Sequence, residues 1–538
     1  MQHDDVDTGP APRAARPGRR PRTLALVVAA TVLAGTVTGA APVAAEQPTA
    51  PDLDPAVTGD PFFSYDRPAE HGVAVEEAVR VPLRDGAFVV CDVSRPAGAD
   101  GSPAPGRFPG IVNDYTAYGR ASGPDWLVTR GYVVLNCDPR GSGDSPGSLD
   151  PFSAQEQRDN ADVVDWLGTR EYSTGEVGQF GTSYGAHIAL LTATQQPEHL
   201  TTVVPVNGIS DWYENTVYHG GVETPRINAW QASTAPETLV TYRQHPLYDD
   251  YWRERSVKAD WDRLDVPVLQ VNGWYDRYRD GMVENLVARP QNVWMVSGPW
   301  EHARTDGLST GAYLAWFDHW LKDLPGAPLP AARITSYEGP RPGAGTGWTQ
   351  FATWPAPGVR SQQVRFTRDG RLATAGGRPG TSTYPVNPSD GQNPDEAAAD
   401  ATRLTWTTDP LEEDLVLAGS VHVALQAAFS ASDGNIAVRL HDVAPDGTVT
   451  RVSAGWLKAS HRQGHTAEVP VEPGRTYELG VDVWPTHYRF PAGHSLRLAV
   501  TSGDWPDMGA DAPAGTVSVR VGAGGSTAAL PLLDTPAG

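Results

Sequence analysis

The chain has 538 residues, a formal net charge of −22 at pH 7, and 40% hydrophobic and 20% charged residues. This composition is typical of a globular protein of two or three domains. The charge argues against a nucleic-acid partner, because binding a phosphate backbone requires a basic face.

Residues 1–45 have the order of an export signal. Five arginines between positions 13 and 22 precede an uncharged run that ends in Val43-Ala44-Ala45. A charged start, an apolar middle and a small-residue end predict export by the Sec route or, given Arg19-Arg20, the twin-arginine route. We therefore expect a secreted protein with no stable membrane insertion after the signal is removed, since no other stretch could span a bilayer. An uncleaved anchor helix is the alternative.

After a linker at 46–73 that is rich in Pro, Asp and Ala, short and almost wholly apolar runs recur between helical stretches. Such runs are typical of strands buried on both faces of a mostly parallel sheet. Strands that alternate with helices predict an α/β domain over residues 74–330. Residues 207–265 are aromatic and too long for a loop, so we expect an inserted helical cap.

Residues 331–538 have a different pattern of hydrophobic and polar residues. Strand-like alternation repeats between Gly, Asp and Pro turns, and no convincing long helix occurs. This pattern predicts an all-β sandwich or jelly roll. The acidic stretch from Asp395 to Asp400 is expected to be a solvated loop, with a calcium site as the alternative.

The strongest motif is Gly181-Thr182-Ser183-Tyr184-Gly185, between an apolar strand at 177–180 and the start of an apolar helix. A strand, a sharp turn that carries serine and a helix are the context of a nucleophile elbow. In that fold the acid and then the histidine follow later strands. Asp276 and His302 stand in this order directly after two predicted strands. The sequence therefore predicts a catalytic triad of Ser183, Asp276 and His302.

Several passages together resemble the cocaine-esterase and Xaa-Pro dipeptidyl-peptidase family of α/β-hydrolases, whose members carry a C-terminal jelly roll. These passages are Val81–Gly86, Asp138–Ser145, Gly181–Gly185, Gly273–Asp276, Gly298–His302 and Phe490–Leu498. The resemblance implies that His302 takes the Ser183 proton and that Asp276 holds the histidine tautomer. It also implies an oxyanion hole made by the backbone N–H of Tyr184 and the hydroxyl of Tyr118, with Tyr115 as the runner-up for the second donor.

The two cysteines, Cys91 and Cys137, either form one disulfide or are two buried free thiols. In this fold the second and fourth strands are neighbours, so a bond between them depends on the register. There is no cluster of Cys and His at ligand spacing, and we expect neither a metal nor an organic cofactor.

We expect a serine hydrolase that works through an acyl-enzyme on a small peptide or ester substrate. The passage Gly208–Asn215 resembles Xaa-Pro peptidases, so peptides with Xaa-Pro at the N-terminus are the first candidate substrate. Asp211 and Glu214 are then expected to face the mouth above Ser183 and bind the substrate ammonium, with Trp212 and Trp274 as aromatic substrate-binding residues. The alternatives are a carboxylesterase or α-amino-acid ester hydrolase or acylase on the same triad, and a carbohydrate-binding protein with an inert hydrolase domain. The sequence leaves the oligomeric state open.

Overall fold

The protein is described here by a computed structural model, which covers residues 59–120, 123–305, 308–340 and 347–534. The predicted export signal and the first part of the predicted linker lie outside these ranges. Within them, no helix has the length and apolar character needed to cross a bilayer.

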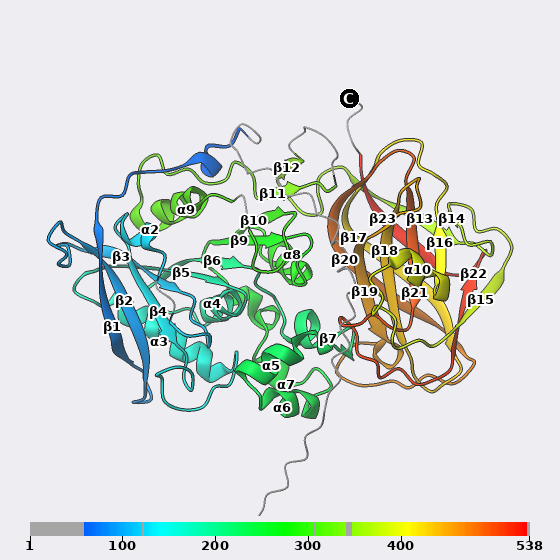
Figure 1. The fold of residues 1–538 in the computed structure, drawn as a ribbon, viewed down its shortest axis with the longest axis horizontal. Helices are drawn as coiled ribbons and strands as arrows, with labels where there is room; N and C mark the ends of the chain where they lie inside the picture. Colours follow the sequence, from blue (N-terminus) through cyan, green and yellow to red (C-terminus); the bar gives the residue numbers. More distant parts are fainter. Residues whose placement is uncertain (1–58, 121–122, 306–307, 341–346, 535–538) are drawn as a thin grey trace, which may run out of the picture. The chain divides into compact units, whose positions relative to one another are not determined.

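The first part of the chain is built on a mixed sheet that contains ten strands among the described residues (Figure 1). In sheet order the strands are β1 (Gly72–Pro82), β2 (Phe88–Ala97), β4 (Val133–Asp138), β3 (Phe108–Asn113), β5 (Ser173–Thr182), β6 (Leu200–Val206), β9 (Val268–Gly273), β10 (Val293–Gly298), β11 (Ile334–Tyr337) and β12 (Trp348–Phe351). The strands from β4 to β11 are parallel, whereas β1, β2 and β12 pair antiparallel with their neighbours. Parallel strands place their carboxyl ends at one edge of the sheet, where loops can assemble a site.

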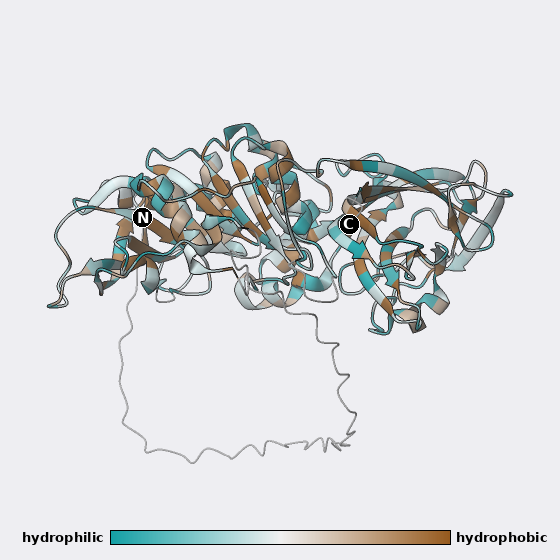
Figure 2. Cartoon of the chain, turned by 90° about the horizontal axis from the view of Figure 1, so that it is seen from above, coloured by the Kyte–Doolittle hydropathy of each residue, from teal (hydrophilic) through white to brown (hydrophobic). Residues whose placement is uncertain are grey.

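Helices cover both faces of this sheet. They are α2 (Asp125–Val128), α3 (Ala154–Gly168), α4 (Tyr184–Thr194), α8 (Arg279–Ala288) and α9 (Thr310–Lys322). Apolar residues of α3, α4 and α8 share one core cluster with Val112, while those of α2 and α9 share another with Ile111. These two neighbours on β3 point to opposite faces because side chains alternate along a strand. Figure 1 shows α4 and α9 on opposite sides of β5 and β6, and Figure 2 shows hydrophobic residues gathered on the strands.

The insertion between β6 and β9 is a cap made of short elements, as the sequence predicts. It contains η2 (Tyr213–Val217, a π-helix), β7 (Tyr218–His219), β8 (Val222–Glu223), η3 (Pro225–Ile227), α5 (Asn228–Thr234), α6 (Thr238–Gln244), α7 (Asp250–Arg253) and η4 (Val257–Arg263). Its aromatic residues pack against one another, with Trp252 and Tyr213 fully buried. The aromatic content of this segment therefore forms a core for the cap.

Residues on both sides of the predicted α/β range contact the sheet and its helices. Within the predicted linker, η1 (Pro61–Ser64) buries Phe62 and Phe63 in the core cluster of α9. After residue 330, β11 continues the sheet through parallel pairing of Ile334 with Met295 on β10. Backbone pairing of this kind has no signature in the amino-acid composition, so the sequence pattern does not record it.

The C-terminal part is a sandwich of two antiparallel sheets, as predicted. One sheet contains β13 (Val359–Phe366), β14 (Leu372–Ala373), β15 (Gly380–Pro385), β17 (Leu415–Phe429), β20 (Thr476–Phe490), β22 (Thr516–Val521) and β23 (Thr527–Leu533). The other contains β16 (Leu404–Thr407), β18 (Asn435–Val443), β19 (Val449–Lys458) and β21 (Ser495–Thr501). Short helical turns are α10 (Glu396–Ala399), η5 (Asp400–Thr402) and η6 (Ala459–His461). Alternate residues of β17, including Val421, Val423 and Leu425, face a shared apolar core.

The acidic stretch in this domain forms ion pairs rather than the expected solvated loop. Glu396 and Asp400 lie 2.6 and 3.1 Å from the guanidinium of Arg403. Burial opposes ionisation of Glu396, but hydrogen bonding to His441 and the nearby charge of Arg439 hold the pKa of Glu396 well below its usual range. The carboxylates are therefore already compensated by protein cations.

The two cysteines form a disulfide. Cys91 on β2 lies directly opposite Cys137 on β4, with a Cα–Cα distance of 4.0 Å and an S–S distance of 2.04 Å. Both side chains are buried. Of the two alternatives open from the sequence, the register of β2 and β4 selects the bond.

We expect the double variant Cys91→Ala/Cys137→Ala to fold with a free energy of unfolding lower by about 4 kcal/mol, because the bond closes a loop with a sequence separation of 46. Urea unfolding of the oxidised wild type and of the variant measures this difference. Wild-type protein isolated from an oxidising compartment should show no titratable thiol in denaturant until a reductant is added. Two thiols that titrate without reductant would contradict the bond.

Candidate active site

Ser183 stands at the sharp turn between β5 and α4. Its backbone has φ 58° and ψ −110°, a left-handed conformation that is rare for a residue with a side chain. The glycines on either side make this turn feasible, because a Cβ on Gly181 would come within 2.5 Å of the backbone carbon of Gly185. The turn is tied to the next strand by the N–H of Ser183, which donates to the carbonyl of Val206. The predicted elbow is therefore present, with the serine at the carboxyl edge of the sheet.

The loops after β9 and β10 bring Asp276 and His302 to the same edge. His302 Nε2 lies 2.9 Å from Ser183 Oγ, and His302 Nδ1 lies 3.0 Å from Asp276 Oδ2. Asp276 is 1% exposed, and its other carboxylate oxygen accepts the N–H of Tyr278. An oriented imidazole within hydrogen-bond reach of a hydroxyl is the arrangement that activates a serine nucleophile.

Close contact between the two loops fixes this geometry. The N–H of Trp274 donates to the carbonyl of Gly298 at 2.8 Å, and that of Tyr275 to the carbonyl of Trp300 at 3.2 Å. A Cβ on Gly273 would lie 1.9 Å from the carbonyl oxygen of Trp300. Glycine is thus required where the loop that carries the acid meets the loop that carries the histidine.

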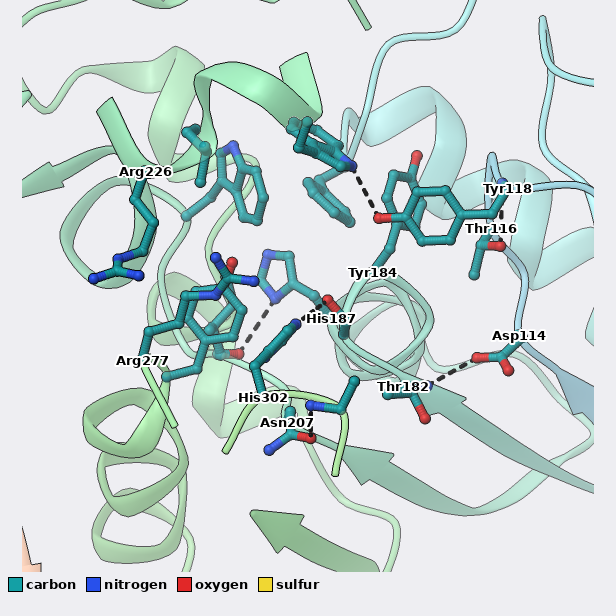
Figure 3. A pocket seen from close by; sticks show the side chains of 18 of the residues that line it. Asp114, Thr116, Tyr118, Thr182, Tyr184, His187, Asn207, Arg226, Arg277 and His302 are labelled. Carbon is teal, nitrogen blue, oxygen red and sulfur yellow. Dashed lines mark hydrogen bonds between the residues drawn. The ribbon is translucent and has the colours of Figure 1, made fainter. Parts of the chain in front are cut away.

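Two hydrogen-bond donors predicted for the oxyanion line the same cavity as Ser183. Tyr184 is the first residue of α4, so its N–H has no acceptor within the helix. The Tyr118 hydroxyl accepts a hydrogen bond from Trp230 Nε1 at 2.9 Å, which leaves its own proton available (Figure 3). Partial desolvation raises the pKa of Tyr118 to about 12, so the phenol stays protonated. Tyr115, the runner-up, is 2% exposed and does not line the cavity.

These groups open into a cavity of about 510 Å³. Its wall includes the aromatic rings of Tyr118, Phe152, Tyr184, Trp212, Trp230 and Tyr278. The size and lining suit a small substrate with an apolar portion. Trp212, predicted from the sequence, is among them, and its indole N–H donates to the hydroxyl of Tyr242.

The structure does not bring the other predicted substrate-binding residues to this cavity. Asp211 is fully buried, and its Oδ1 accepts the N–H groups of Tyr213 and Glu214 at the start of η2. Glu214 is paired with Lys258 at 2.6 Å. Neither carboxylate faces the mouth above Ser183, because both are used inside the cap.

Trp274 also lies apart from the cavity. It is 2% exposed, its indole N–H donates to Ser336 Oγ at 3.0 Å, and its ring stacks on Trp354. The residue therefore packs the base of the loop that carries Asp276. Trp274 stands two residues before the triad acid in the sequence, but its side chain does not line the cavity.

Several residues that sequence reasoning missed contribute to the site. Glu156 on α3 is buried and accepts the Tyr184 hydroxyl at 2.5 Å. Burial raises the pKa of Glu156 to about 8. Trp230 from the cap supports Tyr118, and Arg226 and Arg277 line the cavity. Only the position of Arg277, one residue after Asp276, was a usable signal in the sequence.

The β-sandwich contacts the cap at several residues. The carboxylate of Asp507 in the sandwich pairs with Arg226 of the cap. The backbone carbonyl of Asp507 is hydrogen-bonded to Nδ1 of His219. His219 also stacks on Trp456 of β19, with ring centroids 4.9 Å apart. The sandwich thus positions one cavity residue, although none of its own side chains lines the cavity among the described residues.

Comparisons with known proteins agree with this architecture. The family model described as X-Pro dipeptidyl-peptidase (S15 family) matches residues 85–239 and 228–304. The model of the X-Pro dipeptidyl-peptidase C-terminal non-catalytic domain matches residues 330–523. The cocaine esterase of a Rhodococcus species is 24% identical over 550 residues, which cover 83% of this chain and 94% of that protein.

Solved structures show the same fold. A CocE/NonD family hydrolase from Staphylococcus aureus superposes with a TM-score of 0.74 at 19% identity, covering 85% of this chain and 94% of that one. An α-amino acid ester hydrolase superposes with a TM-score of 0.71 at 21% identity, covering 90% and 100% of the two chains. With both of its domains matched in order, this chain belongs to the cocaine-esterase and Xaa-Pro dipeptidyl-peptidase family of α/β-hydrolases and is a serine hydrolase.

Proposed function

We propose that the protein cleaves an acyl bond through a covalent intermediate on Ser183. The observation that carries this proposal is the hydrogen-bonded series from Ser183 through His302 to Asp276. His302 Nε2 takes the proton of Ser183 Oγ as the oxygen attacks the acyl carbonyl. Asp276 holds the ring so that Nδ1 keeps its proton.

The tetrahedral intermediate is stabilised by the N–H of Tyr184 and the hydroxyl of Tyr118. His302 then gives its proton to the leaving group as the scissile bond breaks, and the acyl group remains on Ser183. Water enters, transfers a proton to His302 and attacks the acyl-enzyme. The acid is released as Ser183 regains the proton from His302.

For the substrate we favour carboxylic esters over peptides with a free N-terminus. An ammonium that is partly desolvated needs a carboxylate partner. Among the described residues that line the cavity, the one carboxylate is Asp114, which already accepts the N–H of Thr182 at 2.8 Å. Burial also raises the pKa of Asp114, which disfavours its ionised form. Xaa-Pro dipeptidyl-peptidase activity is the second candidate, supported by the family models that match both domains.

We expect 4-nitrophenyl butyrate to be hydrolysed and the 4-nitroanilides of Ala-Pro and N-acetyl-Ala-Pro to be poor substrates. The described cavity offers the ammonium of Ala-Pro no free carboxylate, and both anilides present an amide bond, which is less reactive than an aryl ester. Initial rates with equal concentrations of the three compounds provide the measurement. Rapid release from Ala-Pro with no release from its acetylated form would instead support the peptidase.

We also propose that residues 1–45 direct export. The Cys91–Cys137 disulfide supports this proposal, because disulfides persist mainly in oxidising compartments outside the cytosol. N-terminal sequencing of protein recovered from the medium tests the cleavage site. A secreted form that retains its first 45 residues would contradict it.

A further inference from the structure

One charged side chain on the cavity wall has no role in the steps above. Arg277 follows Asp276 directly on the loop after β9 and lines the cavity. Among the described residues it takes part in no hydrogen bond or ion pair, and its Nε is buried without a partner. Its guanidinium carbon lies 5.4 Å from the ring centroid of Tyr278. Figure 3 shows Arg277 beside His302, on the side of the cavity away from Tyr118.

The second arginine of the cavity differs in this respect. Arg226 is paired with Asp507, which also lies 3.4 Å from Arg451 of the sandwich. The charge of Arg226 is therefore balanced within the protein. Figure 3 shows Arg226 and Arg277 on the same side of the cavity, so this side carries one balanced and one unbalanced positive charge.

Among the described residues, none forms an ion pair that would balance the charge of Arg277. His187, which also lines the cavity, is fully buried, and burial lowers the pKa of His187 to about 4, so its ring is neutral at pH 7. Asp114 lies on the far side of the view, beyond Thr182 (Figure 3). Asp276 is within the same loop, but its carboxylate forms no ion pair with Arg277 and points instead to His302 and to the N–H of Tyr278.

An uncompensated guanidinium against an aromatic wall favours an anionic ligand. Removing a charge from water is unfavourable unless a partner compensates it. The guanidinium fork matches a carboxylate through two parallel hydrogen bonds. The chain as a whole carries a charge of −22, which repels anions. A substrate carboxylate would thus need a local cation of this kind at the site.

We propose that the enzyme prefers esters that carry a carboxylate, and that Arg277 binds this carboxylate in the catalytic cavity. This inference rests on the proposed hydrolysis by Ser183. Arg277 acts on specificity and takes no part in the transfer of protons. The carboxylate belongs to the acyl portion or to the leaving group, and the two sources are separated by the choice of probe.

The test uses two matched pairs of esters. For the acyl side, mono-4-nitrophenyl adipate is compared with methyl 4-nitrophenyl adipate. For the leaving-group side, 4-acetoxybenzoate is compared with its methyl ester. Within each pair the carboxylate is either free or masked as a methyl ester, and each kcat/KM is divided by the rate constant without enzyme to correct for intrinsic reactivity.

We expect the wild type to show a kcat/KM at least about tenfold higher for the carboxylate member of one pair, as a charge-assisted hydrogen bond provides. Arg277→Gln should abolish this preference, so that kcat/KM becomes equal within the pair. Arg277→Lys should restore part of it, since it keeps the charge without the fork. Arg304→Gln is the matched control, because this exposed arginine follows His302 closely but does not line the cavity.

Equal kcat/KM within both pairs in the wild type, or an unchanged preference in Arg277→Gln, would overturn the inference. If Arg277→Gln loses all activity, the test is made with the wild type, by measuring how strongly added compounds inhibit its hydrolysis of a methyl ester. Hexanoate should then compete at lower concentration than hexanamide, and equal inhibition would overturn the inference. Failure of the proposed function would look different, since the wild type would neither cleave the methyl esters nor react with a fluorophosphonate at Ser183.

Discussion

Replacing Ser183 with alanine should leave a folded protein whose kcat for a neutral ester is lower by about 10⁴- to 10⁶-fold, as in other enzymes with a serine nucleophile. The expected cause is loss of the covalent step, because the hydroxyl lies 2.9 Å from His302 Nε2 and no other hydroxyl among the described residues is bonded to this ring. A fluorophosphonate, which reacts with activated serine oxygens, should label the wild type at Ser183 and leave the variant unlabelled.

Ser233→Ala is the matched control for this experiment. Ser233 is exposed on α5 of the cap and bonds only to neighbouring groups, so its loss should change neither turnover nor labelling. Circular dichroism and the unfolding midpoint establish that Ser183→Ala is folded. Near-wild-type hydrolysis by Ser183→Ala would rule out this nucleophile, and absence of label in the wild type would favour an inert hydrolase domain.

Replacing Tyr118 with phenylalanine should lower kcat on the order of a hundredfold, about 3 kcal/mol, with little change in KM. The hydroxyl proton is free in the resting site because the oxygen accepts, rather than donates, in its bond with Trp230. The donor is therefore expected to act when the oxyanion forms and not when the substrate binds. Steady-state kinetics with one neutral ester gives both parameters.

Tyr115→Phe serves as the control for this prediction. Its hydroxyl is buried without a hydrogen-bond partner among the described residues and lies outside the cavity. Removing that hydroxyl should leave kcat unchanged. A large loss in Tyr115→Phe together with an unaffected Tyr118→Phe would assign the second donor to the other tyrosine.

The cap and the sandwich act on the site indirectly. Trp230 of the cap holds the Tyr118 hydroxyl, and Asp507 of the sandwich balances Arg226 on the cavity wall. Neither contribution requires the sandwich to touch the substrate. The sequence suggested carbohydrate binding as an alternative role for the sandwich. The contacts of Asp507 support a different role, which is to hold a residue of the cavity wall in place.

The residues that follow strands could be identified from the sequence alone. Ser183, Asp276 and His302 each come directly after a short apolar run, and parallel strands end at one edge of the sheet, so local pattern and chain order predict that the three meet. The elbow glycines could be identified for a similar reason. Gly181 and Gly185 are close in the chain, and a side chain on Gly181 would clash with the backbone of Gly185. These predictions depend on local constraints, which sequence patterns record.

The cavity wall, by contrast, was decided by the tertiary structure. Asp211 and Trp274 were expected at the cavity, yet Asp211 accepts N–H groups of η2 and Trp274 packs against Ser336, whereas Arg277 lines the cavity. Which way a side chain turns depends on partners that are remote in the chain, such as Ser256 for Asp211 and Ser336 for Trp274. The same holds for the disulfide, since only the register of β2 on β4 places Cys91 opposite Cys137. Chain order therefore predicted which three residues meet, and packing between distant segments determined which side chains line the cavity.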